Sequence, residues 1–552
     1  MPKGLSLALA QLNPAVGDIK GNADKLRTLR KKAASQGAQL LMLSELYITG
    51  YPPEDLILKS SFQNAVREEV EALALETADG GPAILLGAPW IENDRLYNAS
   101  LLLSGGKIAV KTFKHDLPNY GPFDEKRVFA AGPLPEPIEF QGLKLGIMIC
   151  EDMWTPAAAA HLKKRGAQIL LVLNGSPYEF NKQNKRQSLA QARVQETGLA
   201  LVYLNQVGGQ DELIFDGESF VLDTQGQCMA QAEAWSEDFL LTQWNEKAGI
   251  LTPEKEKIRD IPQDESAVYH ALMHGLRDYV GKNGFPGVVL GLSGGIDSAL
   301  VAALAVDALG ADKLWSVMLP SPYTAQESLD DAAVLAKTLK CRFDTIPITA
   351  VMKTFEQTLT GVFAGRAVDT TEENIQSRCR GLILMALSNK FGPMVLATGN
   401  KSELSVGYAT LYGDMCGGFA VLKDVYKTQV YKLARWRNAQ KPDSALGPAG
   451  KIIPENILTR APTAELRSGQ TDQDSLPPYE VLDDILECLI EKDMGLQDIV
   501  KRGHDVATVK RVWGMLDRAE YKRRQAPPGV KITSRYLGKD RRYPITNKYR
   551  ET

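Results

Sequence analysis

The chain has 552 residues, of which 64 are lysine or arginine and 67 are aspartate or glutamate, so its formal net charge is −3. That length exceeds what a single core supports, and at roughly 150 residues per domain we expect two to four domains, or fewer if they are large. The nearly balanced charge gives no general attraction for nucleic acid or membrane. No apolar run approaches the roughly 20 residues that a membrane-spanning helix needs.

The cysteine pattern and the first residues indicate a compartment. Six cysteines are scattered along the chain and form neither a metal-type cluster nor the disulfide framework of a secreted protein, so most are expected to be reduced and buried. The segment Met1-Pro2-Lys3-Gly4 leads directly into a strand pattern, without the regions of a secretory signal. The sequence therefore predicts a cytoplasmic protein.

Short β-rich runs alternate with amphipathic helical patterns along the chain, which is typical of layered α/β folds. A helix is expected at 22–35, where Leu26, Leu29 and Ala33 fall on one face and Gly37 stands near the end. In the first half, strands are expected at 5–12, 39–43, 83–88, 101–103, 145–149, 169–173 and 199–204.

A polar stretch that includes Pro253 and Pro262 interrupts this alternation and is expected to link two domains. We therefore expect one domain at 1–246, a linker at 247–264 and a second domain at 265–552. The second domain starts a fresh βαβ series, which favours a doubly wound parallel sheet. Its first helix is expected at 266–280, and its strands at 288–290, 313–318, 342–348 and 393–398.

The most informative segment of the second domain lies between a predicted strand and a predicted helix. Its eight residues are Gly291, Leu292, Ser293, Gly294, Gly295, Ile296, Asp297 and Ser298. Adjacent glycines let the backbone turn tightly and point several N–H groups at one anion, while the helix start and the serine hydroxyls add to the attraction. The segment therefore predicts a phosphate-binding loop, with Asp297 holding Mg²⁺. No lysine precedes Ser298 to serve the terminal phosphates, so chemistry at the α-phosphate with release of pyrophosphate is favoured.

The first domain has candidate catalytic residues of its own. Cys150 stands directly after the strand expected at 145–149 and opens a helical pattern, a junction that is expected to expose the thiol and to lower its pKa. Glu45 ends another apolar run, and Lys114 lies in a loop that is dense in turn-forming and polar residues. Each residue alone is explained as well by a structural role, and it is their combination that points to catalysis.

Both sets of residues resemble those of known families. The loop at 291–298 resembles the pyrophosphate loop of the ATP pyrophosphatases, which adenylate a carbonyl or carboxylate oxygen and then displace AMP with a nitrogen or sulfur nucleophile. Glu45, Lys114 and Cys150, in their local sequence contexts, resemble the Glu-Lys-Cys triad of the carbon–nitrogen hydrolase (nitrilase) superfamily. That resemblance implies an α-β-β-α sandwich in which the cysteine attacks an amide carbonyl, the glutamate transfers the proton to the leaving ammonia, and the lysine stabilises the oxyanion.

As a whole, the chain resembles the glutamine-dependent NAD⁺ synthetase family. The resemblance implies that deamido-NAD⁺ and MgATP form an adenylate, which ammonia from glutamine converts to NAD⁺ and AMP. It also implies a homo-oligomer and a channel for ammonia, with no nucleic-acid or membrane partner. The glutamine-binding residues that it implies are Tyr120, Glu151, Ser176 and Lys182.

The same resemblance assigns substrate contacts in the second half. Thr398, Lys427 and Thr463 are implied to contact ATP together with the phosphate loop, and Glu403 is implied to bind Mg²⁺ with Asp297. The residues that it assigns to deamido-NAD⁺ are Asn374, Arg378, Glu403, Asp414 and Lys522. Of these, Asn374 and Arg378 are one helical turn apart and face one side.

Three other interpretations remain open. Another glutamine-dependent ATP pyrophosphatase would use an unrelated glutaminase, and one such type needs an N-terminal cysteine where this chain has Pro2. A tRNA-modifying pyrophosphatase would share the loop but is expected to carry a basic surface domain, against which the net charge of −3 counts. A nitrilase with an inert appended module is disfavoured by the intact Asp297, Ser298 and Glu403.

Overall fold

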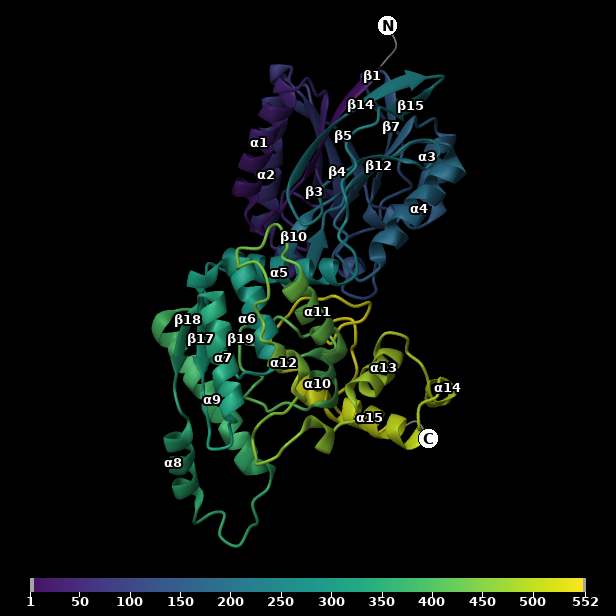
Figure 1. Ribbon diagram of the computed structural model, residues 1–552. Helices are drawn as coiled ribbons and strands as arrows, with labels where there is room; N and C mark the ends of the chain where they lie inside the picture. Colours follow the sequence, from purple (N-terminus) through teal and green to yellow (C-terminus); the bar gives the residue numbers. More distant parts are fainter. Residues whose placement is uncertain (1–3, 550–552) are drawn as a thin grey trace. The chain divides into compact units, whose positions relative to one another are not determined.

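The computed structural model describes residues 4–549. The chain divides into two compact units, one ending at Pro262 and the other beginning at Gln263. Each unit has its own strands and helices and is described by itself (Figure 1). Across the described residues, no helix is both long and apolar enough to cross a membrane.

The first unit has four layers, in which two facing β-sheets are covered by helices on their outer sides (Figure 1). The larger sheet has the strand order β15-β14-β1-β2-β3-β4-β5, and the smaller has the order β13-β12-β9-β8-β7-β6. Helices α1 (Ile19–Ser35) and α2 (Ser60–Glu76) pack on the larger sheet, and α3 (Pro156–Lys164) and α4 (Lys182–Thr197) pack on the smaller one. The expected α-β-β-α sandwich is confirmed.

The strands of the larger sheet are β1 (Gly4–Gln11), β2 (Leu40–Met42), β3 (Ala83–Glu92), β4 (Arg95–Ser104), β5 (Lys107–Phe113), β14 (Asp238–Lys247) and β15 (Ile250–Pro253). Those of the smaller sheet are β6 (Ile138–Phe140), β7 (Leu143–Ile149), β8 (Ile169–Asn174), β9 (Leu201–Asn205), β12 (Phe220–Leu222) and β13 (Cys228–Gln231). A separate hairpin pairs β10 (Val207–Gln210) with β11 (Leu213–Asp216). The 3-10 helices of this unit are η1 (Glu54–Leu58), η2 (Thr77–Asp79), η3 (Glu125–Arg127) and η4 (Cys150–Met153).

Alternation along β1 explains how the layers are held together. Leu5, Leu7 and Leu9 belong to the core between the two sheets, whereas Ala8 and Ala10 face the helices on the other side. Successive side chains of a strand point to opposite faces, so one strand serves both cores. Buried on both faces, β1 is a continuous apolar run, which is why its position could be predicted from the sequence.

Several boundaries differ from those expected, and two of them have a clear cause. Helix α1 begins at Ile19, one turn before the expected start, because the Asp18 side chain accepts a hydrogen bond from the Gly21 N–H at 3.0 Å and caps the helix. The stretch expected as a linker at 247–264 begins with a strand, since β15 pairs antiparallel with β14. Strand β15 lies at the edge of its sheet, where polar residues and a terminal proline are tolerated, so its sequence resembles that of a loop.

The second unit is built on a five-stranded parallel sheet with the order β18-β17-β16-β19-β20, which confirms the doubly wound fold. Its strands are β16 (Val288–Gly291), β17 (Leu314–Met318), β18 (Arg342–Thr345), β19 (Met394–Ala397) and β20 (Phe419–Ala420). The order of strands reverses between β16 and β19. In open α/β sheets, ligands bind in the crevice beyond the carboxyl ends of the strands at this point.

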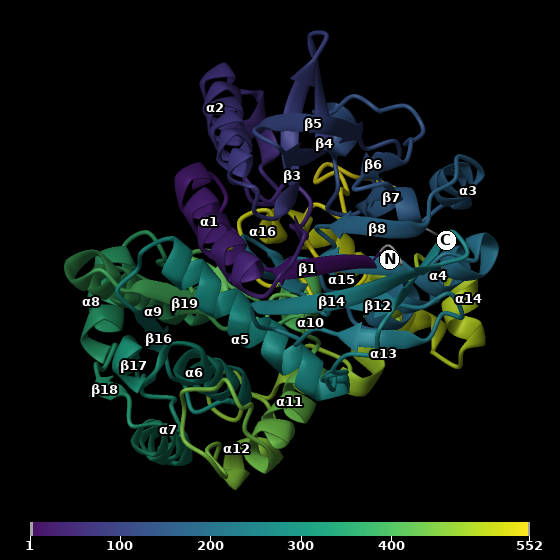
Figure 2. The same cartoon turned by 90° about the horizontal axis from the view of Figure 1, so that it is seen from above.

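Helices cover both faces of this sheet. Helices α8 and α9 pack on one face, and α6 and α7 lie on the other (Figure 2). Helices α10 and α13 to α15 form a separate apolar cluster. The helices of the unit are α5 (Asp264–Lys282), α6 (Ile296–Leu309), α7 (Gln326–Leu339), α8 (Thr349–Leu359), α9 (Thr370–Phe391), α10 (Lys401–Val406), α11 (Lys427–Ala439), α12 (Glu455–Thr459), α13 (Tyr479–Ile490), α14 (Leu496–Lys501), α15 (Val506–Arg518) and α16 (Glu520–Arg523), with 3-10 helices η5 (Ala311–Lys313) and η6 (Asp472–Asp474).

Candidate active sites

The three predicted catalytic residues of the first unit all follow strand ends. Glu45 comes after β2, Lys114 directly after β5, and Cys150 directly after β7. Lys114 donates a hydrogen bond from Nζ to Glu45 Oε1 at 2.8 Å, and both side chains are fully buried. The structure thus brings into contact Glu45 and Lys114, which are 69 positions apart and which the sequence analysis grouped in one triad.

The carboxylate of Glu45 is fixed from three sides. Its Oε1 accepts hydrogen bonds from Lys114 Nζ and from Asn98 Nδ2 at 2.7 Å, and its Oε2 accepts one from the Gly175 N–H at 2.8 Å. A carboxylate has about four lone-pair sites, so Oε2 keeps one for a further proton. Glu45 is therefore held in a fixed orientation and can still accept a proton as a base.

A second carboxylate, Glu125, was missed by the sequence analysis. Its Oε1 accepts hydrogen bonds from Lys114 Nζ at 2.8 Å and from the Tyr51 hydroxyl at 3.2 Å. Burial raises the pKa of Glu125 to about 7, and the charge of Lys114 opposes this rise. Burial alone would lower the pKa of Lys114, but the charges of Glu125 and Glu45 outweigh it and raise that pKa well above the usual value.

Cys150 differs from its expected state. Burial raises the pKa of the Cys150 thiol, the charge of Glu45 adds to the rise, and Lys114 opposes it. The expectation of a lowered pKa is therefore wrong, because the short 3-10 helix η4 replaces the expected helix and the thiol is buried rather than exposed. The residue has a left-handed backbone, with φ of 45°. Non-glycine residues in this region are uncommon and cluster at functional sites.

Asp152 joins the two segments that carry Lys114 and Cys150. Its Oδ1 accepts hydrogen bonds from the backbone N–H groups of His115 at 3.0 Å and Asp116 at 2.8 Å. Its Oδ2 accepts one from the Ile149 N–H at 3.0 Å. The buried carboxylate thus connects the residue after the lysine to the residue before the cysteine. Burial raises its pKa to about 6, although the backbone N–H groups oppose the rise.

The four residues assigned to glutamine have different surroundings. The Tyr120 hydroxyl donates to the Glu151 carboxylate at 3.0 Å, and Tyr120 is half exposed. Ser176 is buried, and its hydroxyl accepts a hydrogen bond from Arg186 at 3.2 Å. The Lys182 ammonium lies 5.8 Å from the ring centroid of Phe123. Their contact with glutamine stays a prediction.

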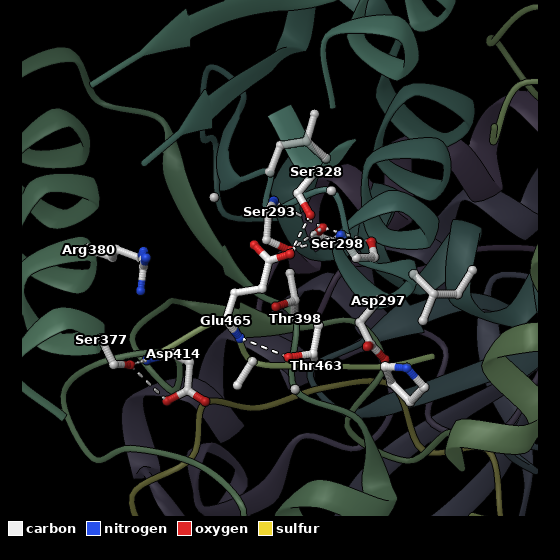
Figure 3. A pocket seen from close by; sticks show the side chains of 18 of the residues that line it. Ser293, Asp297, Ser298, Ser328, Ser377, Arg380, Thr398, Asp414, Thr463 and Glu465 are labelled. Carbon is white, nitrogen blue, oxygen red and sulfur yellow. Dashed lines mark hydrogen bonds between the residues drawn. The ribbon is translucent and has the colours of Figure 1, made fainter. Parts of the chain in front are cut away.

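In the second unit, a cavity of about 290 Å³ lies at the switch point of the sheet (Figure 3). All eight residues of the predicted phosphate loop line it. So do six other residues that matter below, namely Thr398, Glu403, Asp414, Lys427, Thr463 and Arg380. Every residue assigned to ATP therefore borders one cavity, although the segments lie far apart in the sequence.

The phosphate loop is held in a tight conformation. Gly294 has a φ of 80°, and a Cβ atom there would lie 2.4 Å from the backbone oxygen of Ser328. Ser298 Oγ, in the first turn of α6, accepts a hydrogen bond from the Ser293 N–H at 3.2 Å. Only glycine fits at position 294, because both the limited space and the positive φ exclude a side chain there.

Three charged residues meet at one end of the cavity. Lys427 Nζ pairs with the Asp297 carboxylate and, at 3.0 Å, with Glu403 Oε1. Asn400 Nδ2 donates to Asp297 Oδ1 at 2.9 Å. Burial raises the pKa of Glu403 to about 7, and Lys427 opposes the rise.

This arrangement fits the predicted magnesium ion. Mg²⁺ binds proteins through one or two carboxylates and takes its other ligands from water and substrate phosphates. Asp297 and Glu403 supply such a pair, brought to one place by Lys427. Within residues 4–549, no group of three or more histidine, cysteine, aspartate or glutamate side chains could hold a metal, so phosphate oxygens are needed to complete the set.

Three of the residues assigned to deamido-NAD⁺ contact a loop rather than the cavity. Asn374 Oδ1 accepts a hydrogen bond from the Thr410 hydroxyl at 2.9 Å, and Arg378 Nε donates to the Leu411 carbonyl at 3.2 Å. Lys522 Nζ donates to the carbonyls of residues 407 and 409 at 2.8 and 2.7 Å. All three hold the segment 407–411, so their direct contact with substrate stays a prediction.

Asp414 links this segment to the cavity. Its Oδ1 accepts a hydrogen bond from the Thr410 N–H at 2.6 Å, and its N–H donates to the Ser377 hydroxyl at 3.0 Å. Burial raises the pKa of Asp414. Figure 3 shows Ser377, Asp414 and Arg380 on one side of the cavity, and Thr463 and Glu465 toward the phosphate loop.

The sequence analysis missed Arg380, Ser328 and Glu465. Ser328 Oγ donates to Glu465 Oε1 at 2.6 Å beside the phosphate loop. Arg380 had a weak signal, since it is two residues beyond Arg378 in the same helix. Ser328 and Glu465 had none, because an ordinary serine in a helix and a glutamate in a loop carry no pattern.

Comparisons with known proteins match both units. The chain matches the carbon–nitrogen hydrolase family model over residues 6–248 and the NAD synthase family model over residues 268–526. It is 49% identical over 545 residues to a glutamine-dependent NAD(+) synthetase of Rhodobacter capsulatus, covering 99% of each chain. It is 44% identical to the enzyme of that name from Thermotoga maritima, covering all of both chains.

A solved structure agrees over the full length. The glutamine-dependent NAD⁺ synthetase from Acinetobacter baumannii, in complex with adenosine diphosphate, has a TM-score of 0.79 and 42% identity to this chain. The alignment covers 100% of both chains. Two family models in order, full-length relatives above 40% identity and a solved structure of an adenosine diphosphate complex all point to the same family. The chain belongs to the glutamine-dependent NAD⁺ synthetase family.

Proposed function

We propose that this chain is a carbon–nitrogen ligase that converts deamido-NAD⁺ to NAD⁺ with ATP and with ammonia taken from glutamine. The observation that carries the proposal is the presence of two candidate sites on one chain. The first unit joins a thiol, a base and a buried ammonium group, and the second joins a phosphate loop to two carboxylates and a lysine. Amide hydrolysis and ATP-dependent activation need these two sets.

Hydrolysis of glutamine follows from the geometry of the first site. Because burial and the charge of Glu45 raise the pKa of the Cys150 thiol, its proton must move to Glu45 as the sulfur attacks the amide carbonyl. The free lone pair on Glu45 Oε2 is available to receive it, and Lys114 stabilises the oxyanion. Glu45 returns the proton to the leaving ammonia. Water then breaks the thioester, giving glutamate and the free thiol.

Activation takes place in the second site. A carboxylate does not react with ammonia, so an oxygen of the nicotinate carboxylate first bonds to the α-phosphorus of ATP while the bond to pyrophosphate breaks. Backbone N–H groups of the phosphate loop hold the departing pyrophosphate. When bound by Asp297 and Glu403, Mg²⁺ supplies charge neutralisation of the phosphates. Ammonia then bonds to the activated carbon, and AMP leaves. A cytoplasmic location, a homo-oligomer and a channel for ammonia complete the proposal as predictions.

The test follows purified protein with MgATP and deamido-NAD⁺, supplied with either glutamine or ammonium chloride. NAD⁺, AMP and glutamate are quantified for the native chain and for Cys150→Ala. We expect both donors to support NAD⁺ formation by the native chain. The variant should lose the glutamine-driven reaction and keep the ammonium-driven one. If neither donor gives NAD⁺ although ATP is still cleaved to AMP, deamido-NAD⁺ is not the acceptor.

A further inference from the structure

Helix α11 begins at the cavity with Lys427, and its first N–H groups are capped from outside the helix. Such groups have no partner within a helix, and the preceding residue, Tyr426, provides no side-chain cap. The Lys427 N–H donates to Ser402 Oγ at 2.9 Å, and the Thr428 N–H donates to Asp483 Oδ2, also at 2.9 Å. Ser402 belongs to α10 and Asp483 to α13, so three helices meet at this point.

A hydrogen bond between Ser402 and Asp483 closes this link. Ser402 Oγ donates to Asp483 Oδ1 at 2.5 Å, so the hydroxyl that accepts from Lys427 also donates to Asp483. A hydroxyl can accept and donate at once, whereas an ionised carboxylate only accepts, so the direction of each hydrogen bond is fixed. Both side chains are buried, and neither is among the described residues that line the cavity. They can therefore act on a ligand only through other residues.

The link joins residues that belong to the candidate magnesium site. Glu403 follows Ser402 in α10, and its Oε1 pairs with Lys427 Nζ at 3.0 Å. The Lys427 ammonium also lies 5.3 Å from the ring centroid of Tyr479, which is one turn before Asp483 in α13. Helix α13 therefore fixes the start of α11 and also borders the charged end of its first side chain.

We propose that Asp483 is a positioning residue, which holds Glu403 and Lys427 in the arrangement that binds Mg²⁺ and the phosphates of ATP. The inference rests on the proposed function. Mg²⁺ demands near-ideal geometry from its ligands, and its two candidate carboxylates come from different helices, α6 and α10. Lys427 pairs with both of them, so a shift of α11 against α10 would disturb the pair. Asp483 opposes that shift, because it binds α10 through Ser402 and α11 through its backbone.

The experiment measures the binding of ADP, which needs no turnover. Calorimetry with saturating Mg²⁺ and with EDTA gives two dissociation constants each for the native chain, Asp483→Ala and Ser402→Ala. Residues that orient metal ligands are worth roughly ten- to hundredfold in metal affinity, so we expect a loss of that size with Mg²⁺. The loss with EDTA should be much smaller, because the phosphate-loop N–H groups bind phosphate without the metal and are not held by α13.

The double variant separates one shared link from two unrelated packing defects. If Asp483 acts through Ser402, the second substitution removes a link that is already broken, and the double variant should lose less than the product of the two single losses. A loss with Mg²⁺ that equals this product would overturn the proposal. If Asp483→Ala does not fold, Ser402→Ala still tests it, since alanine is well tolerated inside a helix. Equal losses with Mg²⁺ and with EDTA in that variant, or native affinity under both conditions, would overturn it too.

Asp484→Ala is the matched control. Asp484 is the next residue of α13, and it pairs with Arg502 at 3.0 Å and His504 at 2.5 Å rather than with α10 or α11. This variant should have a lower unfolding temperature, but Mg²⁺ should tighten its binding of ADP as much as in the native chain. A loss of the Mg²⁺ effect there would show that any damage to α13 is sufficient, and the role assigned to Asp483 would fail. The proposed function fails separately, if the native chain forms no NAD⁺.

Discussion

The Asp152 carboxylate holds the segments that carry Lys114 and Cys150 in one geometry through three backbone N–H groups. In Asp152→Asn, Oδ1 can still accept from His115 and Asp116, but the amide NH₂ would face the Ile149 N–H, and two donors repel each other. We expect the rate of glutamine hydrolysis to fall by roughly ten- to hundredfold, since small displacements of catalytic groups are costly. NAD⁺ formation from ammonium should not change.

The pH profile distinguishes this positioning role from a loss of stability. Because the pKa of Asp152 is raised to about 6, the native residue takes a proton as the pH falls below that value, and its ionised acceptor is lost. The difference in rate between the native chain and Asp152→Asn should therefore shrink below pH 6 and be largest above pH 7. Asp116→Asn is the matched control, since its backbone N–H still reaches Asp152. A ratio of rates that is the same at pH 5 and pH 8 would contradict the assignment.

Residues proposed to act directly on a substrate were easier to predict than those that hold them in place. Cys150 and Glu45 stand at strand ends, where a polar side chain after an apolar run is visible in the sequence. Glu125 and Asp152 act by accepting hydrogen bonds from groups that fold beside them, and nothing in their own sequence distinguishes them from surface carboxylates such as Asp124. The pKa of the Cys150 thiol could not be predicted from the sequence either, because it depends on burial and on Glu45 rather than on the position of the residue before a helix.

At the scale of elements, the phosphate loop depends on how closely α7 approaches it. A Cβ atom on Gly294 would meet the backbone oxygen of Ser328 at 2.4 Å, and the φ of 80° adds about 1–2 kcal/mol of strain for any other residue. Gly294→Ala should therefore weaken ADP binding and NAD⁺ formation from ammonium by at least about tenfold.

Binding calorimetry and the ammonium-driven assay check this expectation. Gly281→Ala serves as the control, because a Cβ atom there has open space and no positive φ. Native ADP affinity in Gly294→Ala would show that the loop and α7 move apart freely. In that case the short distance to the Ser328 backbone oxygen would not explain why residue 294 is a glycine.

Strands buried on both faces were predicted well, whereas most edge strands were not, with β18 as an exception. The strands β1, β7, β8 and β16 are apolar runs, and their positions follow from the sequence with small differences at the ends. Strand β15 lies at a sheet edge with β14 beside it, and polar residues stand where the two strands meet, so part of this hairpin was taken for a linker. The pairing of β14 with β1 is a tertiary contact, which local sequence does not encode.

At the scale of the whole molecule, the two units have separate cores and separate chemistry. The sheets of each unit bury their own apolar residues, and the boundary after Pro262 falls in a polar segment. A change in the core of the second unit should therefore spare the first. The buried network around Asp307 offers the sharpest test. Asp307 accepts hydrogen bonds from Arg437 Nε and the Tyr269 hydroxyl, both at 2.5 Å, and thereby joins α5, α6 and α11.

Arg437→Leu should reduce the free energy of unfolding of the second unit by roughly 3–5 kcal/mol, because it leaves Asp307 buried with one partner fewer. ADP binding should weaken as well, since α11 begins with Lys427 at the cavity. Unfolding in denaturant is monitored by glutamine hydrolysis for the first unit and by ADP binding for the second, so the two units are measured separately. Lys501→Ala, which removes an exposed ion pair, should change neither. Arg437→Leu should lower the denaturant concentration at which ADP binding is lost. If it lowers the concentration at which glutamine hydrolysis is lost by the same amount, the units unfold as one, and the division after Pro262 has no energetic meaning.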